Sequence, residues 1–78
     1  MNFYLVTYSV KFGQRDKHTK PETEEFNAES IEALWERMQA ETGEPWAIRI
    51  YKIWCDNKPV KDFAAELIRP RTENQKPG

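Results

Sequence analysis

The sequence has few of the residues that build reactive centres. Cys55 is its only cysteine and His18 its only histidine, which excludes an internal disulfide, a cysteine metal cluster and a paired-histidine metal site. The three glycines, Gly13, Gly43 and Gly78, stand far apart, and this spacing excludes the glycine-rich loops that cradle phosphates. We therefore expect no cofactor, no metal and no enzymatic activity.

Long apolar runs are also lacking. No run approaches the roughly 18 apolar residues of a membrane span, and the N-terminus lacks the charged and apolar regions of a secretory signal. A lone thiol fits a reducing compartment. We expect a soluble cytoplasmic protein of 78 residues, a length near the lower limit for folding on a single core.

Charges of opposite sign lie in different parts of the chain, although the net charge is only −1. Residues 22–44 carry eight acidic side chains and one base, Arg37, for a local charge of −7. Residues 1–21 and residues 45–78 each carry a net charge of +3. Such segregation bears on partners and on the steering of their approach, and not on the fold.

The first half of the chain predicts two strands. Residues 2–12 alternate in polarity, with one apolar face made by Tyr4, Val6, Tyr8, Val10 and Phe12. Phe3 and Leu5 are apolar on the other face, so we expect that end of the strand to be covered on both sides. Residues 13–21 predict a basic surface loop, and the glutamate-rich residues 22–28 predict an edge strand.

One long amphipathic helix follows the junction that begins at Asn27. Ser30 is the predicted N-cap, and Gly43 with the nearby Pro45 predicts the end of the helix. The residues that recur at helical spacing and should face the sheet are Ile31, Leu34, Trp35 and Met38.

The last third of the chain returns as a strand over residues 46–55. Its apolar set changes parity at Tyr51, which indicates a β-bulge or a stretch covered on both faces. Residues 56–59 have turn chemistry. After them, residues 60–63 are compatible with a short strand, whereas Asp62 is suited to cap a short helix that ends at Ile68; we favour the helix.

These elements predict an α+β fold. We expect a small antiparallel sheet of three to four strands, covered by one amphipathic helix, in the order strand, strand, helix, strand, with a short C-terminal element. Residues 1–69 would form a single domain, and residues 70–78 have the composition of a disordered tail.

Few pairs of side chains suit catalysis. Cys55 with His18 is the one conceivable nucleophile and base, but a partly buried thiol and a solvated imidazole explain these residues better. Two pairs of neighbouring acids, Glu24 with Glu25 and Glu32 with Glu36, have the chemistry of an acid and a base. Acids on an exposed face more often serve solvation, so we assign no catalytic residue.

The acidic middle of the chain is the first candidate binding surface. A docking surface for a basic partner would use acids on and before the helix, since complementary charge speeds association and sets specificity. The candidate residues are Glu25, Glu29, Glu32 and Glu36. The alternative is that the outer face of a helix in water needs charge.

The second candidate combines bases with aromatic rings. Its basic residues are Arg15, Lys17 and Lys20 in the loop, near His18, and Arg49 and Lys52 on the last strand, beside Tyr51 and Trp54. Bases next to aromatic residues on a sheet are typical of platforms for single-stranded nucleic acid. Packing of the two rings in the core or at an edge is the alternative, and the pI near 5.8 favours it.

Around the junction Ala28-Glu29-Ser30-Ile31, residues 2–56 resemble tiny bacteriophage proteins. The order of elements and the size are similar to those of small phage inhibitors of bacterial RNA polymerase and of some anti-CRISPR proteins. The resemblance implies a non-catalytic inhibitor that occupies a surface on a larger host protein or ribonucleoprotein complex. A nucleic-acid-binding domain and a homodimeric accessory subunit are the alternatives, and a membrane partner is not expected.

Overall fold

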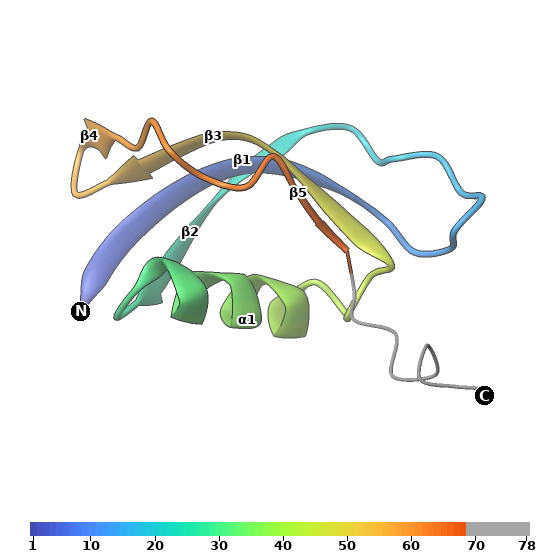
Figure 1. The fold of residues 1–78 in the computed structure, drawn as a ribbon, viewed down its shortest axis with the longest axis horizontal. Helices are drawn as coiled ribbons and strands as arrows, with labels where there is room; N and C mark the ends of the chain where they lie inside the picture. Colours follow the sequence, from blue (N-terminus) through green and yellow to red (C-terminus); the bar gives the residue numbers. More distant parts are fainter. Residues whose placement is uncertain (69–78) are drawn as a thin grey trace.

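The computed structural model describes residues 1–68, which form five strands and one helix (Figure 1). The elements follow in the order β1 (Asn2–Lys11), β2 (Glu22–Ala28), α1 (Ile31–Glu41), β3 (Ala47–Cys55), β4 (Lys58–Pro59) and β5 (Glu66–Ile68). The predicted α+β class and the order of the first four elements are confirmed. The predicted tail, residues 70–78, and the last residue of the predicted domain lie outside the described residues.

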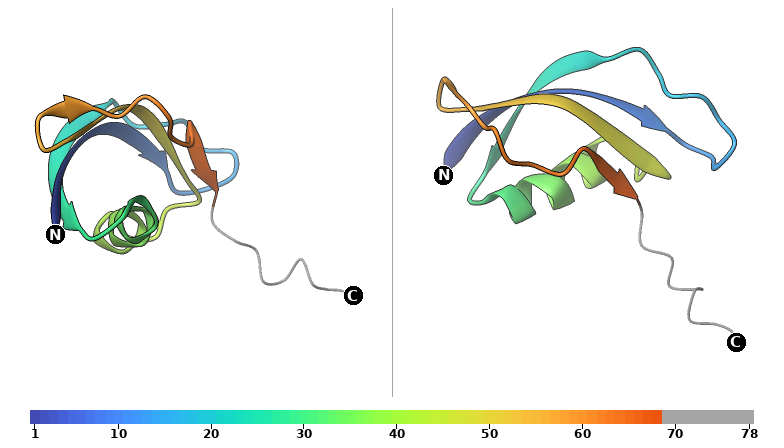
Figure 2. Two further views of the ribbon diagram at one scale, coloured as in Figure 1. Left: turned by 60° about the vertical axis from the view of Figure 1, so that its left-hand side comes forward. Right: turned by 45° about the horizontal axis from the view of Figure 1, so that its top comes forward.

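All strand pairs are antiparallel, and the sheet order is β2-β1-β3-β4, with β5 also paired to β3. β4 and β5 therefore share the outer edge of β3, one at each end of that strand. The segment between them runs beside β3 (Figure 2) and adds hydrogen bonds from the Ile50 N–H to the Ala65 carbonyl and from the Val60 N–H to the Ile53 carbonyl. β2 forms the opposite edge, as the sequence predicted.

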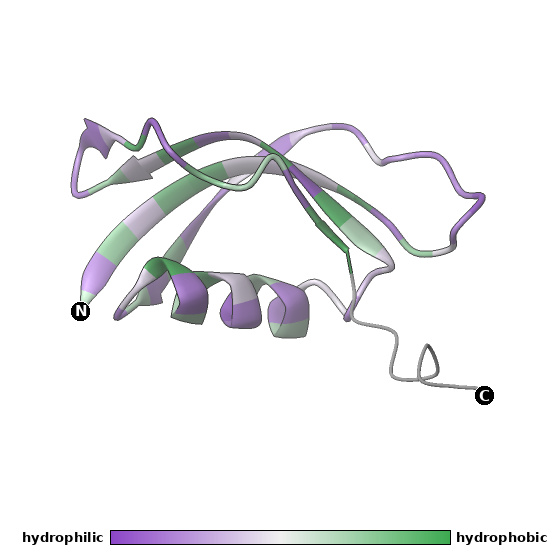
Figure 3. Cartoon of the chain, viewed as in Figure 1, coloured by the Kyte–Doolittle hydropathy of each residue, from purple (hydrophilic) through white to green (hydrophobic). Residues whose placement is uncertain are grey.

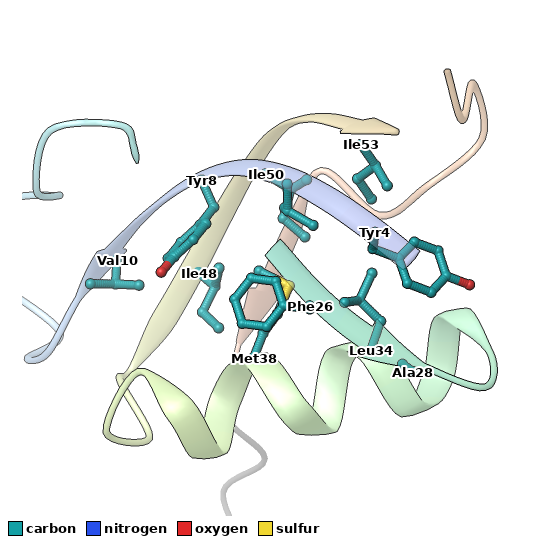
Figure 4. Packing of buried hydrophobic residues seen from close by; sticks show 11 residues of the cluster. Tyr4, Tyr8, Val10, Phe26, Ala28, Leu34, Met38, Ile48, Ile50 and Ile53 are labelled. Carbon is teal, nitrogen blue, oxygen red and sulfur yellow. The ribbon is translucent and has the colours of Figure 1, made fainter. Parts of the chain in front are cut away.

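The helix lies against one side of the curved sheet, which we call the covered face (Figure 1). Leu34 and Met38 point from α1 into the cluster (Figure 4) and are fully buried, while Ile31 and Trp35 pack at its margin. The predicted helical stripe is thus confirmed. The sheet residues of the cluster are Tyr4, Val6, Tyr8, Val10, Phe26, Ala28, Ile48, Ile50 and Ile53. Phe12, which alternation assigned to the same face, is exposed, because β1 ends one residue before it.

Both ends of α1 follow the local signals in the sequence. The Ser30 hydroxyl accepts a hydrogen bond from the Ala33 N–H at 3.1 Å, as an N-cap does. At the other end Gly43 has a positive φ of 87°, and the N–H groups of Gly43 and Glu44 donate back to the carbonyls of Ala40 and Gln39. This pattern is a Schellman motif, which satisfies carbonyls that the last turn leaves free.

The parity change in β3 is a β-bulge. Thr7 lies opposite Lys52, whereas Tyr8 lies opposite Ile50, so Tyr51 is the extra residue. The bulge lets Ile48 and Ile50 share the covered face with Ile53 although their spacing is odd. The predicted turn is confirmed too: Asp56 and Asn57 have φ values of 50° and 69°, as a two-residue type I′ hairpin turn requires.

The helix predicted at the C-terminal end of the domain is wrong. Residues 66–68 form β5, and residues 60–63 are not a strand either. Six residues gain little as an isolated helix, because the first turn costs more entropy than one hydrogen bond returns. As a strand, the same segment pairs with the otherwise open edge of β3, and Leu67 comes to lie opposite Ile48 at the core.

Candidate binding surfaces

The acidic belt, by which we mean the eight acids from Glu22 to Glu44, lies on β2, on α1 and in the turns next to α1. Both elements alternate between hydrophilic and hydrophobic residues along the chain (Figure 3). Glu29, Glu32 and Glu36 are exposed in or next to α1, and the structure brings these three predicted residues to one side of the molecule. Within residues 1–68, Glu41 is the only acid of the belt in an ion pair, with 2.9 Å between its Oε2 and the Arg37 Nε. Most of the charge of the belt is therefore not neutralised inside the described chain.

Glu25 lies apart from the other three predicted acids. It is opposite Leu5 on the side of β2 that faces away from the helix. Glu22 and Glu24 alternate with it and lie on the helix side. β2 therefore carries carboxylates on both sides of the sheet edge, which the sequence alone did not establish.

A groove of about 500 Å³ lies between α1 and the end of β2. Small side chains, including Ala28, Ala33 and Ala40, form part of its wall. The charged residues that line the same groove are Glu29, Glu36 and the ion pair of Arg37 with Glu41. The groove is a depression within the acidic belt.

Tyr8 ties one acid of the belt to the core. Its hydroxyl donates a 2.8 Å hydrogen bond to Glu24 Oε1. Burial raises the pKa of Tyr8 above its ordinary value, and the hydrogen bond and charge of Glu24, with the charges of Glu22 and Glu41, raise it further. Tyr8 consequently keeps its proton and acts as a donor. Lys20 lines a hollow of about 260 Å³ with these acids, so it is separated from the other predicted basic residues.

The side of the sheet away from the helix, which we call the open face, collects exposed aromatic residues. Tyr51 and Trp54 are 42% and 41% exposed, and Phe3 at 37% joins them from β1. Trp54 lies opposite Leu5, and Lys52 opposite Thr7. The expectation that Phe3 and Leu5 are covered on both sides is wrong for Phe3. Phe3 and Leu5 occupy the odd-numbered positions of β1, whereas the core residues of that strand occupy the even-numbered ones. This alternation in the sequence places both residues on the same face as Trp54.

The predicted basic residues do not form one patch. Arg49 and Lys52 are exposed on the open face of β3. Arg15 and Lys17 lie in the loop between β1 and β2, which extends beyond the sheet (Figure 1). Glu66 lies opposite Arg49 across the pairing of β5 with β3, so the positive charge of this face is partly offset.

A polar network centred on the buried Ser9 anchors the loop to the open face. Ser9 is 0% exposed, and its hydroxyl lies 3.3 Å from His18 Nδ1 and 3.2 Å from the Tyr51 hydroxyl. His18 Nε2 is 3.6 Å from Glu66 Oε2. The residue types are those of a serine–histidine–carboxylate triad, but Ser9 is closed off from any substrate in this conformation. The network holds the loop and the bulged Tyr51 in place.

His18 differs from its predicted solvated state, since its side chain is only 14% exposed. Burial lowers its pKa, and the nearby cations Arg49 and Lys11 lower it further, while Glu66 acts in the opposite direction. His18 is therefore mostly neutral near pH 7. It is also far along the sheet from Cys55, which pairs with Tyr4 at the other end of β1 and has Asp56 as its hydrogen-bond partner. The pair considered for nucleophilic chemistry is not brought together.

Comparison with known proteins yields no relative: no protein family, curated protein or solved structure matches the chain. The resemblance to phage inhibitors stays a prediction. Within residues 1–68, no group of three histidine, cysteine, aspartate or glutamate side chains is placed to hold a metal ion. No helix in the same residues has the length and apolarity needed to cross a membrane.

Proposed function

We propose that the protein is a non-catalytic, phage-encoded binding module that inhibits or modulates a host nucleic-acid-handling complex. Its binding surface is the acidic belt, and its partner presents a basic surface of the kind that otherwise contacts nucleic acid. The observation that carries the proposal is a set of exposed acids on α1 and just before it, which have no ion-pair partner within residues 1–68: Glu32 and Glu36 on the helix, and Glu29 before its cap.

Stabilisation of the fold does not explain why Glu29, Glu32 and Glu36 are all acidic. Of the helix acids, Glu32 suits the positive end of the helix dipole, a contribution of about 0.3–1 kcal/mol. Glu36 lies in the middle of α1, and Glu29 precedes the cap. Negative charge concentrated around α1 attracts and orients an approaching basic partner before contact.

Charge reversal tests the acidic belt directly. The full chain is assayed by biolayer interferometry against purified bacterial RNA polymerase and a purified CRISPR effector complex, with transcription and DNA-cleavage assays beside it. We expect the Glu32→Lys/Glu36→Lys variant to lose at least about tenfold in affinity, because the sign of the local field is reversed. We expect wild-type binding to weaken as salt is raised, since charges more than about 8 Å apart are screened at physiological ionic strength.

The matched control changes the charge by the same amount at another place. Asp16→Lys/Asp62→Lys alters two exposed acids outside the belt. Equal affinities of the two double variants would show that net charge, not the belt, sets binding. Unchanged affinity of Glu32→Lys/Glu36→Lys would overturn the proposal.

A second candidate function is binding of single-stranded nucleic acid on the open face. The observation that favours it is the joint exposure of Phe3, Tyr51 and Trp54 beside Arg49 and Lys52. Stacking of a base on an aromatic ring contributes about 1–3 kcal/mol. Trp54→Ala should then weaken binding by about five- to 150-fold in fluorescence anisotropy with short DNA and RNA strands at low salt.

Phe12→Ala is the control for that experiment, because Phe12 is an exposed ring outside the strands. Even non-specific binders reach dissociation constants of about 10⁻⁴–10⁻⁶ M. No binding of single- or double-stranded DNA or RNA at tens of micromolar protein would remove this candidate.

A further inference from the structure

The two edges of the sheet differ in whether another segment of the described chain pairs with them. The outer edge of β3 is occupied by β4, β5 and the hydrogen bonds at Ile50 and Ile53. Within residues 1–68, no strand, loop or side chain bonds to the outer edge of β2. In an antiparallel pair, every second residue of an edge strand directs its N–H and C=O groups outward. The seven residues of β2 therefore offer a ready-made row of donors and acceptors.

We propose that the outer edge of β2 binds an extended basic segment of the partner protein by strand addition. This inference rests on the proposed function and names the form that its partner takes. Main-chain hydrogen bonds would provide the pairing, and lysine or arginine side chains of the added strand would face the glutamates of β2.

The negative charges of β2 indicate that the added strand carries cationic side chains. On the open-face side, a residue of the added strand would pass Glu25; on the helix side, it would pass Glu22 and Glu24. Beyond the end of the strand, the groove with Glu29 and Glu36 can take a further cationic side chain. None of these five acids forms an ion pair within residues 1–68. An added strand with cations is therefore complementary to the first half of β2 and to the groove beyond its end.

The same charges disfavour a second copy of this chain. Antiparallel pairing of β2 with another β2 would bring glutamates against glutamates across the new interface, and like charges directly opposite are destabilising. β2 is also fixed in place: the Thr7 and Thr23 hydroxyls lie 2.8 Å apart, and Tyr8 holds Glu24. Strand addition therefore needs no rearrangement of β2.

Amide hydrogen exchange tests strand addition on the full chain. In the free protein, we expect alternate amides of β2 to exchange fast, because they face outward. The probe is an eight-residue peptide whose lysines occupy adjacent pairs of positions, so that they face the glutamates on both sides of β2, with threonine or valine at the other positions. At a peptide concentration of about 100 times its Kd, the fast set should slow by roughly 100-fold, since exchange then requires release of the peptide.

The matched probe is the same peptide N-methylated on its backbone, which keeps the charge and loses the donors. We expect it to leave the fast amides of β2 unprotected. Glu25→Lys should weaken binding of the unmethylated peptide at least tenfold more than Glu32→Lys, because Glu25 is on β2 and Glu32 is on the outside of α1. Sedimentation of the free chain should show a monomer.

Three results would overturn the inference: equal protection by both peptides, no protection of β2 by the unmethylated peptide, or a dimer that already protects β2. The outcomes separate it from the proposed function. Loss of binding to the purified complex in Glu32→Lys/Glu36→Lys without protection of β2 would sustain the acidic belt and reject strand addition. Protection of β2 by the peptide, with no binding of the protein to either purified complex, would sustain strand addition and reject the proposed function.

Discussion

The two faces of the sheet make different demands on their residues. On the covered face, buried side chains from β1, β2 and β3 form one cluster with Leu34 and Met38. On the open face, burial is concentrated around Ser9 and the nearby Ala47, while Phe3, Tyr51 and Trp54 remain accessible. The covered face thus accounts for folding. The open face, the acidic belt and the outer edge of β2 are the surfaces on which binding is to be sought.

The largest effect should follow from a cavity at the covered face. Leu34→Ala removes a side chain that is fully buried in the cluster, and the free energy of unfolding should fall by about 2–5 kcal/mol. Urea denaturation followed by circular dichroism measures it. If Leu34→Ala does not fold, the volume-conserving Leu34→Met should fold with a loss under about 1.5 kcal/mol.

Glu36→Ala serves as the control on the outside of the same helix and should change stability by no more than about 0.5 kcal/mol. A cost of less than about 1 kcal/mol for Leu34→Ala would contradict the assignment of the covered face as the core.

A smaller loss should follow from removing the cap that starts the covering helix. Ser30→Ala leaves the Ala33 N–H without its acceptor and should cost about 1 kcal/mol. Ser30→Asp retains an acceptor oxygen and should keep most of the stability. Thermal denaturation compares the three proteins. Equal melting temperatures for the alanine and aspartate variants would argue against the cap.

The polar network of the open face predicts a pH effect. Because the pKa of His18 is lowered on folding from its ordinary value of 6.5, the unfolded chain binds more protons below that pH. The wild-type protein should therefore lose stability as the pH falls through 6.5 and below. His18→Asn cannot take up this proton, and its free energy of unfolding should fall less over the same range. Parallel stability curves for the two proteins would contradict the lowered pKa.

The smallest effect on folding should come from the open-face tryptophan. Trp54 lies directly opposite Leu5 on the neighbouring strand and is 41% exposed. A cross-strand pair of this kind contributes about 0.2–1 kcal/mol, so Trp54→Ala should cost about that much in urea denaturation. A loss as large as that of Leu34→Ala would mean that the two faces do not differ as described.

Local signals in the sequence were sufficient to predict the ends of the helix and the residues that it buries. The Ser30 cap, the Gly43 terminus and the stripe around Leu34 predicted the observed structure. The parity change at Tyr51 indicated the observed bulge as one of two alternatives. Each depends on residues close together in the chain. The exposed positions of Glu29, Glu32 and Glu36 followed from the same helical periodicity.

The rest depended on partners that are distant in sequence. β5 forms because residues 66–68 hydrogen-bond to the otherwise unpaired edge of β3. The sequence of residues 66–68 alone does not indicate that this edge is available. His18 is buried because the loop folds back onto Ser9 and Glu66. Glu25 is separated from the other acids, and Phe3 joins Trp54, through the pairing of strands across β1.

Hydrogen–deuterium exchange of the chain, free and bound to whichever purified complex it recognises, tests the central proposal most directly. Peptides of the free and bound protein are compared across α1, β2 and β3, with Glu32→Lys/Glu36→Lys as the variant that should not bind. We predict that binding protects β2 and α1 and leaves the amides around Tyr51 and Trp54 unchanged. Protection confined to the open face of β1 and β3 would contradict the assignment of the acidic belt as the binding surface.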